Sequence, residues 1–169
     1  ELPYNKCFLA DYMSGSKTRE EIALRSQAFF KEQIIELMLN TRITSLDLAA
    51  QTVTDNSGYV YSYTKLLFAV GGSVVLPSIP GINQKHVFPF YTLADTQEIL
   101  DYVRKQRVKK MVIIGAGLSG LECADALLNC VEKITILERG PHVLPSLVPE
   151  CAGQWIQEKM QRQGIDFYC

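Results

Sequence analysis

The stretch KKMVIIGAGLSG, residues 109–120, determines how the rest of the chain is interpreted. Residues 112–114 form a short apolar run, as expected for a parallel strand that is buried on both faces. Three glycines follow at G-x-G-x-x-G spacing, Gly115, Gly117 and Gly120, and an apolar helical pattern comes next. A second apolar run, KITILE (residues 133–138), then ends in Glu138. This order predicts a strand, a tight turn, a helix and a second strand.

The glycines have different expected roles at the end of the first strand. Gly115 allows the tight turn, Gly117 lets the backbone approach a pyrophosphate, and Gly120 lets helix and strand pack closely. The backbone N–H groups of Ala116, Leu118 and Ser119 complete the turn, and the positive end of the helix dipole points at the phosphates. Glu138 lies at the distance along the chain where a carboxylate binds the ribose hydroxyls, although a surface acid at a strand end is the alternative. The pattern predicts a dinucleotide site.

The composition is that of an ordinary globular protein and excludes several classes. The chain has 169 residues, is 47% hydrophobic and carries a formal net charge of −1. This charge argues against nucleic acid as the main partner, and no apolar run approaches the roughly 20 residues that span a membrane. The five cysteines form no C-x-x-C pair, and neither histidine has metal-ligand spacing. We therefore expect free thiols, a reducing, cytoplasmic location and no metal.

The first half of the chain alternates between helical and extended patterns. Thr18 is an expected N-cap for a helix that reaches about Gln33. The remaining segments are expected to be extended: strands at 35–39, 42–47 and 66–70, the last one buried, and a hairpin formed by 52–54 and 59–63 around Asp55–Gly58. The prolines and glycine of 77–81 mark a linker.

The second half predicts an α/β fold. Thr92 and Asp95 indicate a capped helix with Ile99, Leu100 and Val103 facing inward. Between the strand at 133–138 and a third strand at 165–168, the pattern predicts a helix with its apolar face formed by Ala152, Trp155, Ile156 and Met160. Strand, helix, strand, helix and strand from Met111 to Tyr168 make one mononucleotide-binding half of a doubly wound, Rossmann-like sheet.

Several separated motifs of the chain resemble one family. YTKLLFAVGG (63–72), IPG (79–81), TLAD (92–95) and GAGLSGLE (115–122) are similar to segments of the FAD-dependent pyridine nucleotide-disulfide oxidoreductase superfamily. PYNK (3–6) narrows the resemblance to the branch of ferredoxin and rubredoxin reductases and nitrite reductase flavodomains.

The resemblance implies an FAD- and NAD-binding oxidoreductase that passes hydride between nicotinamide and flavin, and electrons to a small redox protein or redox centre. Residues 1–78 resemble the latter part of an FAD-binding domain, and residues 79–169 the first half of an NAD-binding Rossmann domain. The implied fold is a parallel sheet with helices plus a small β-meander, incomplete at both ends. Implied cofactor-binding residues, besides the turn and Glu138, are Lys6, Ile43, Ala69 and Gly71 near the flavin and Glu122 near the nicotinamide.

Departures from the family pattern leave alternatives open. The flavin G-x-G-x-x-G motif and the late Gly-Asp motif are both absent, and Tyr91 replaces an arginine that contacts FAD phosphate in many relatives. The redox cysteine pair is also missing, which disfavours disulfide reduction, and no catalytic side chain is assigned. The alternative function is a non-catalytic nucleotide-binding module. For Glu122, the alternative is a solvent-facing helix stripe with Asp125 and Asn129.

Overall fold

The computed structural model describes residues 1–169, and the chain forms two compact units. We call Glu1–Tyr4 and Ala23–Ser73 the meander unit, and Asn5–Ile22 and Val74–Cys169 the sheet unit. This division follows the packing of the chain. The predicted domain boundary between residues 78 and 79 rests on the resemblance to an FAD-binding and an NAD-binding domain, and it stays a prediction.

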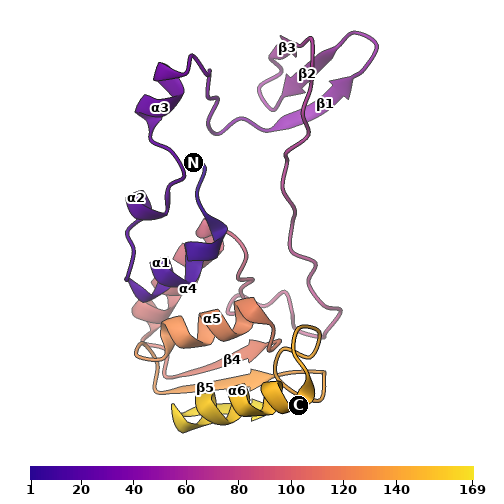
Figure 1. Ribbon diagram of the computed structural model, residues 1–169. Helices are drawn as coiled ribbons and strands as arrows, with labels where there is room; N and C mark the ends of the chain where they lie inside the picture. The colour runs from indigo at the N-terminus through magenta and orange to yellow at the C-terminus, as the bar shows by residue number, and fades with distance from the viewer. The chain divides into compact units, whose positions relative to one another are not determined.

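The sheet unit contains a three-stranded parallel sheet (Figure 1). Its strands are β4 (Lys110–Ile114), β5 (Lys133–Leu137) and β6 (Ile165–Tyr168), in the order β4-β5-β6. The helices α5 (Leu118–Leu127) and α6 (Glu150–Arg162) connect them. This is the predicted α/β, Rossmann-like arrangement.

The two faces of the parallel sheet differ sharply. The register aligns Ile113, Ile136 and Phe167 across the sheet, and this face packs into the core. On the other face Val112 is 60% exposed and Ile114 is 57% exposed. The expectation that the first strand is buried on both faces is therefore wrong for this chain, because only one face is covered.

Two helices of the sheet unit can be compared with the predicted helices. In α4 (Leu93–Gln106) Thr92 and Asp95 form the predicted capping box, and Ile99, Leu100 and Val103 are buried. In α6 the prediction for Trp155 is wrong, since its side chain is 65% exposed. The buried face of α6 contains Gly153, because a Cβ there would lie 2.3 Å from His142 Nδ1. Trp155 lies two residues further along, roughly 200° around the helix from Gly153, and faces solvent.

The N-terminal segment of the sheet unit packs on helices from the second half of the chain. It forms the 3-10 turn η1 (Lys6–Phe8) and the helices α1 (Leu9–Ser14) and α2 (Arg19–Ile22). Met13 of α1 is buried with its sulfur 3.9 Å from that of Cys123 in α5. The predicted helix from Thr18 to Gln33 is interrupted after Ile22, because Ser26 caps a separate helix, α3 (Gln27–Glu32), which lies in the meander unit.

The meander unit contains a small antiparallel sheet with the strand order β1-β2-β3. Its strands are β1 (Ile43–Asp47), β2 (Thr52–Asp55) and β3 (Val60–Ser62), as predicted for the strand and hairpin of this region. The strands predicted at 35–39 and 66–70 do not form. Neither segment has a partner strand in the described chain, and Leu67 is 86% exposed. Apolar residues favour a strand only where a neighbouring strand takes up the backbone hydrogen bonds.

Candidate dinucleotide-binding site

The glycine-rich turn joins β4 to α5 at the carboxyl end of the parallel sheet. Gly115 has φ +104°, a conformation that favours glycine, and its N–H donates to the Leu137 carbonyl at 2.7 Å. A Cβ on Gly120 would lie 2.0 Å from the Gly115 carbonyl oxygen, whereas a Cβ on Gly117 would meet no heavy atom within 4 Å. The turn thus has close packing at Gly120 and open space at Gly117.

The first turn of α5 presents unpaired backbone donors. Gly117 is its N-cap and has no side chain to accept a hydrogen bond. The first intrahelical bond runs from the Leu121 N–H to the Gly117 carbonyl at 3.1 Å, so the N–H groups before it have no partner within the helix. Leu118 and Ser119 are exposed. Such a helix start can bind an anion through its backbone.

Glu138 lies directly against this turn. One carboxylate oxygen accepts the Ala116 N–H at 2.7 Å, and the other accepts the Gly140 N–H at 2.7 Å. Burial by itself raises the pKa of this carboxyl, but the hydrogen bonds from Gly140 and Ala116 outweigh it, so the pKa is lowered. Glu138 is therefore an ionised acceptor, and each oxygen still has a lone pair for another donor.

The loop after Glu138 supports both the acid and the turn, and the sequence alone did not reveal this. The Leu144 N–H donates to the Ala116 carbonyl at 2.9 Å, with Leu144 buried and at φ +54°. Gly140 has no room for a side chain, because a Cβ there would lie 2.8 Å from Pro145. Both backbone polar groups of Ala116 are thus occupied by the segment that begins at Glu138. A glycine two residues after Glu138 could have indicated a tight turn beside the acid, whereas nothing in the sequence indicates the role of Leu144.

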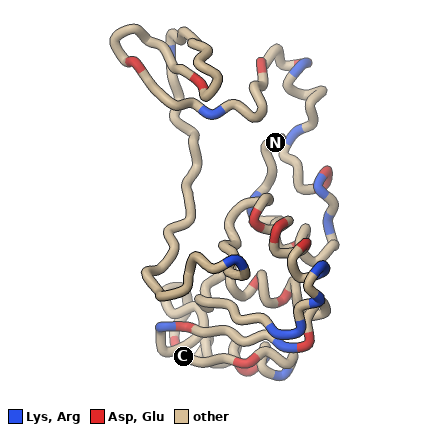
Figure 2. The backbone as a smooth tube through the Cα atoms, turned by 180° about the vertical axis from the view of Figure 1, so that it is seen from behind, with Lys and Arg blue, Asp and Glu red and all other residues tan.

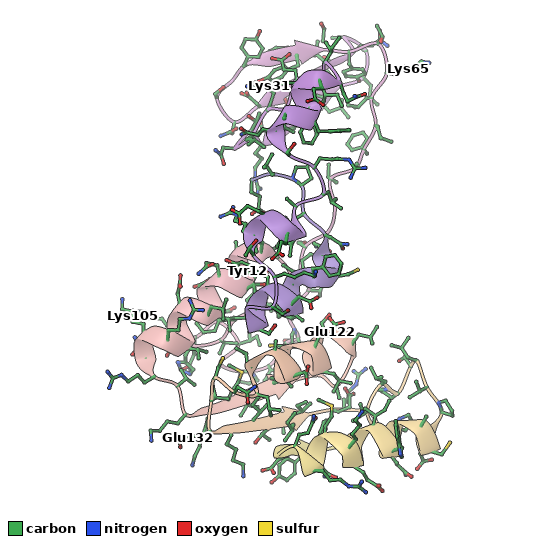
Figure 3. The ribbon with its side chains drawn as sticks, turned by 60° about the vertical axis from the view of Figure 1, so that its left-hand side comes forward. Tyr12, Lys31, Lys65, Lys105, Glu122 and Glu132 are labelled. Atoms are coloured by element: carbon green, nitrogen blue, oxygen red, sulfur yellow. The ribbon has the colours of Figure 1, made fainter.

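Glu122 lies one turn further along α5. Its side chain is exposed and, as Figure 3 shows, lies on the side of α5 away from the sheet. Asp125 and Asn129 are also exposed, as a solvent-facing stripe would require. The nicotinamide role of Glu122 stays a prediction.

The predicted flavin-binding residues fall into both compact units. Lys6 belongs to η1 in the sheet unit, whereas Ile43, Ala69 and Gly71 belong to the meander unit. Ile43 is exposed on β1, and Ala69 and Gly71 are exposed in a segment without regular structure. Their role as flavin contacts stays a prediction.

The Lys6 ammonium nitrogen lies 3.3 Å from the centroid of the Tyr91 ring. Lys6 therefore has a defined partner, and that partner is the residue that departs from the family pattern. The Tyr91 backbone is fixed in turn, because its N–H donates to Asp95 at 3.2 Å.

Other chemistry-bearing residues form no second centre. All five cysteines are free, and burial raises the pKa of the Cys123 thiol to about 11, which makes it unreactive. No group of three or more His, Cys, Asp or Glu side chains is placed to hold a metal ion. No helix has the length and apolar character that crossing a membrane requires.

Comparison with known proteins places this geometry in a family. The model of the pyridine nucleotide-disulphide oxidoreductases matches residues 1–169. The chain is 32% identical over 164 residues to the nitric oxide reductase FlRd-NAD(+) reductase of Pectobacterium atrosepticum, covering 96% of the chain and 42% of the relative. It is 27% identical over 168 residues to the rubredoxin-NAD(+) reductase of Pseudomonas putida, covering 98% of the chain and 43% of the relative.

Solved structures agree with this assignment. A ferredoxin reductase from Rhodopseudomonas palustris superposes with a TM-score of 0.89 at 25% identity, over 99% of this chain and 41% of that one. The chain thus spans less than half the length of these relatives. It belongs to the pyridine nucleotide-disulphide oxidoreductase family.

Proposed function

We propose that the protein containing this chain is an FAD-dependent NADH oxidoreductase that passes electrons to a small redox protein or redox centre. The observation that carries the proposal is the joint placement of the open Gly117 turn and the ionised Glu138 at one edge of the parallel sheet. Relatives whose names describe rubredoxin and ferredoxin reduction support the choice of acceptor class.

The residues at this edge fit a dinucleotide. The space around Gly117 admits a pyrophosphate next to the N–H groups at the start of α5. Glu138 can accept hydrogen bonds from both ribose hydroxyls while its bonds to Ala116 and Gly140 hold it in place. When bound, the nicotinamide and flavin supply the hydride chemistry, and the protein binds and orients them.

The same geometry favours NADH over NADPH. A 2′-phosphate would stand within a few ångströms of the Glu138 carboxylate, which is ionised. Arg139 follows Glu138 and could in principle meet that phosphate. Its side chain is exposed in the bend that follows β5, and its charge contributes to lowering the Glu138 pKa. The Glu138 carboxylate, in contrast, is held against the turn by two backbone hydrogen bonds. We therefore give the carboxylate the greater weight.

The flavin contacts are part of the same proposal. Lys6, Ile43, Ala69 and Gly71 are the positions in this chain that we assign to flavin, and Glu122 is assigned to the nicotinamide. Residues 1–78 would then form the latter part of an FAD-binding domain and residues 79–169 the first half of an NAD-binding Rossmann domain. The resemblance supports these assignments.

A test of the function uses the full-length protein. We expect it to be purified yellow, with visible flavin absorbance that is bleached when NADH is added without oxygen. NADH binding without bleaching would favour the alternative, a non-catalytic nucleotide-binding module. A Gly117→Val variant, which blocks the turn, should lose bleaching but retain its flavin, because Gly117 belongs to the nicotinamide-nucleotide site.

A further inference from the structure

A pocket lies at the end of the sheet unit opposite the glycine turn. It has a volume of about 560 Å³ and is formed where α4 ends and β4 begins. Its residue Lys109 and the turn residue Gly115 lie at opposite ends of β4, roughly 20 Å apart at the rise of an extended strand. The volume is in the range of roughly 300–1,000 Å³ that small-molecule sites occupy. The pocket is therefore separate from the dinucleotide site.

The floor of the pocket is apolar. Leu100 and Val103 of α4 are buried there, and Val108 and Val131 are half-buried beside them. Their exposed surface is hydrocarbon without polar atoms, and it is narrow, because Leu100 is 5% exposed and Val103 6%. An apolar ligand body fits this floor.

The rim of the pocket is cationic, although the whole chain has a net charge of −1. Five of the seven residues from Arg104 to Lys110 are lysine or arginine. Figure 2 shows Lys and Arg positions close together along this stretch, at the lower right of the view. Lys109 is neutralised by Glu132, with 2.8 Å between nitrogen and oxygen. Arg104 and Arg107 also line the pocket, and neither forms an ion pair with any of the 169 described residues.

Helix capping explains Arg104 but not Arg107. A cation in the last turn of α4 is favourable for the helix dipole, and Arg104 and Lys105 already supply it. Arg107 follows the helix at φ +49°, a position where glycine is the usual residue and a side chain costs about 1 kcal/mol. The Val108 N–H donates to the Val103 carbonyl at 3.1 Å, which fixes this turn and holds Arg107 at the rim.

We propose that this pocket binds a small organic anion, a carboxylate on a medium-length hydrocarbon body. The two guanidinium groups of Arg104 and Arg107 pair with the carboxylate, a geometry in which arginine is stronger than lysine. The hydrocarbon lies on the floor formed by Leu100, Val103, Val108 and Val131. The inference does not depend on the proposed oxidoreductase function.

The test titrates the full-length protein with hexanoate, octanoate and decanoate, and with octylammonium as the cation of matched length. Binding is followed by calorimetry and by the alkylation rate of Cys130, an exposed thiol that lines the pocket. Cys151, exposed and outside the pocket, is the internal reference. We expect affinity to rise about threefold per added carbon until the floor is full, and ligand to slow alkylation of Cys130 alone. Octylammonium should bind at least about tenfold more weakly than octanoate.

Substitutions distinguish a specific role of Arg104 and Arg107 from the effect of the positive charge at the end of α4. Arg104→Gln and Arg107→Gln should each weaken octanoate binding about tenfold, and NADH affinity should not change. Lys105→Gln removes the same charge from the same helix but touches a residue that does not line the pocket, so binding should change less than about twofold. Lys105 and Glu132 are labelled at this end of the unit in Figure 3. Equal binding of octylammonium and octanoate, or full affinity in Arg107→Gln, would overturn the proposal.

Discussion

The two units of this chain each contain a three-stranded sheet, but they are stabilised in different ways. Every buried apolar side chain belongs to the sheet unit, where helices from both halves of the chain enclose one core. In the meander unit the buried residue is Asp55, whose carboxylate accepts four hydrogen bonds from the hairpin turn and its neighbour Tyr61. Core burial therefore shapes the unit that carries the candidate site, whereas turn hydrogen bonds shape the other.

The largest expected effect tests the close packing in the sheet unit. Gly120→Ala places a methyl group where the Gly115 carbonyl oxygen stands, so we expect a loss of about 3 kcal/mol of stability in thermal or urea unfolding. The matched control is Gly117→Val, whose φ of −76° and ψ of 179° suit any residue and whose surroundings are open. Its free energy of unfolding should stay within about 1 kcal/mol of the wild type, because valine is a poorer N-cap than glycine but meets no other atom.

The same pair of variants separates folding from binding. Gly117→Val should lose NADH affinity, because its side chain occupies the approach of the pyrophosphate. An unchanged stability of Gly120→Ala would contradict the geometry of the turn. An NADH affinity of Gly117→Val within about twofold of the wild type would contradict the assignment of Gly115–Gly120 to the cofactor.

The contrast between the units also explains what the sequence could predict. Patterns that depend on neighbours a few residues away predicted the capping box of Thr92 and Asp95 and the hairpin around Asp55, although the helix predicted from Thr18 to Gln33 is two separate helices. Predictions that depended on a contact with a segment elsewhere in the chain were wrong in two places. The apolar run at 66–70 has no strand to pair with. The face of α6 that carries Gly153 packs on His142 in the loop before the helix, and Trp155 faces solvent.

The candidate site shows the same limit. The spacing of Gly115, Gly117, Gly120 and Glu138 predicted residues that the structure brings together at one sheet edge. Leu144 was missed, because its contribution is a backbone N–H that reaches Ala116 across the fold. A hydrogen bond from the main chain can be made by almost any residue type, so the sequence does not indicate it.

The second prediction concerns the charge at the sheet edge. At an effective dielectric near 20, a 2′-phosphate close to the Glu138 carboxylate costs on the order of 3 kcal/mol, roughly a hundredfold in affinity. We expect kcat/KM of the full-length enzyme to favour NADH over NADPH by about that factor, and Glu138→Ala to narrow the preference. Glu132→Ala, which removes a like charge from the opposite end of β5, is the control and should leave it unchanged. A wild-type enzyme with equal values, or one that prefers NADPH, would refute the role of Glu138.

The third prediction uses acid to weaken the meander unit selectively. The hydrogen bond from the Ser57 hydroxyl lowers the Asp55 pKa most, whereas burial raises it. The backbone N–H groups of Ser57 and Tyr59 and the Tyr61 hydroxyl lower it further, so the pKa falls from 3.8 to about 2. A carboxyl whose pKa is lower in the folded state stabilises the fold above its unfolded pKa. This contribution is lost as the pH falls from about 4 through about 2.

The protection of the β1–β3 amides from hydrogen exchange, taken relative to the intrinsic exchange rate at each pH, should therefore fall in that pH window, before the protection of the β4–β6 amides changes. In Asp55→Asn the exchange of these amides should be faster at neutral pH and should no longer have this acid-dependent step. If the protection of the wild-type β1–β3 amides did not change as Asp55 becomes protonated, the hydrogen bonds to the Asp55 carboxylate would not be what stabilises the meander unit.

The smallest expected effect tests whether the N-terminal segment belongs with the sheet unit. Lys6 and Tyr91 are far apart in the sequence, and the 3.3 Å between the ammonium nitrogen and the ring centroid is a direct contact between them. A cation–π pair at an exposed site contributes about 0.5–1 kcal/mol. A double-mutant cycle with Lys6→Met and Tyr91→Leu, measured by unfolding of the full-length protein, should give a coupling in that range. Tyr91→Phe keeps the ring and should retain most of the coupling, while Tyr12→Phe, which removes only a hydroxyl bonded to Gln97, should show none with Lys6. Zero coupling between Lys6 and Tyr91 would contradict the contact between η1 and the residues just before α4.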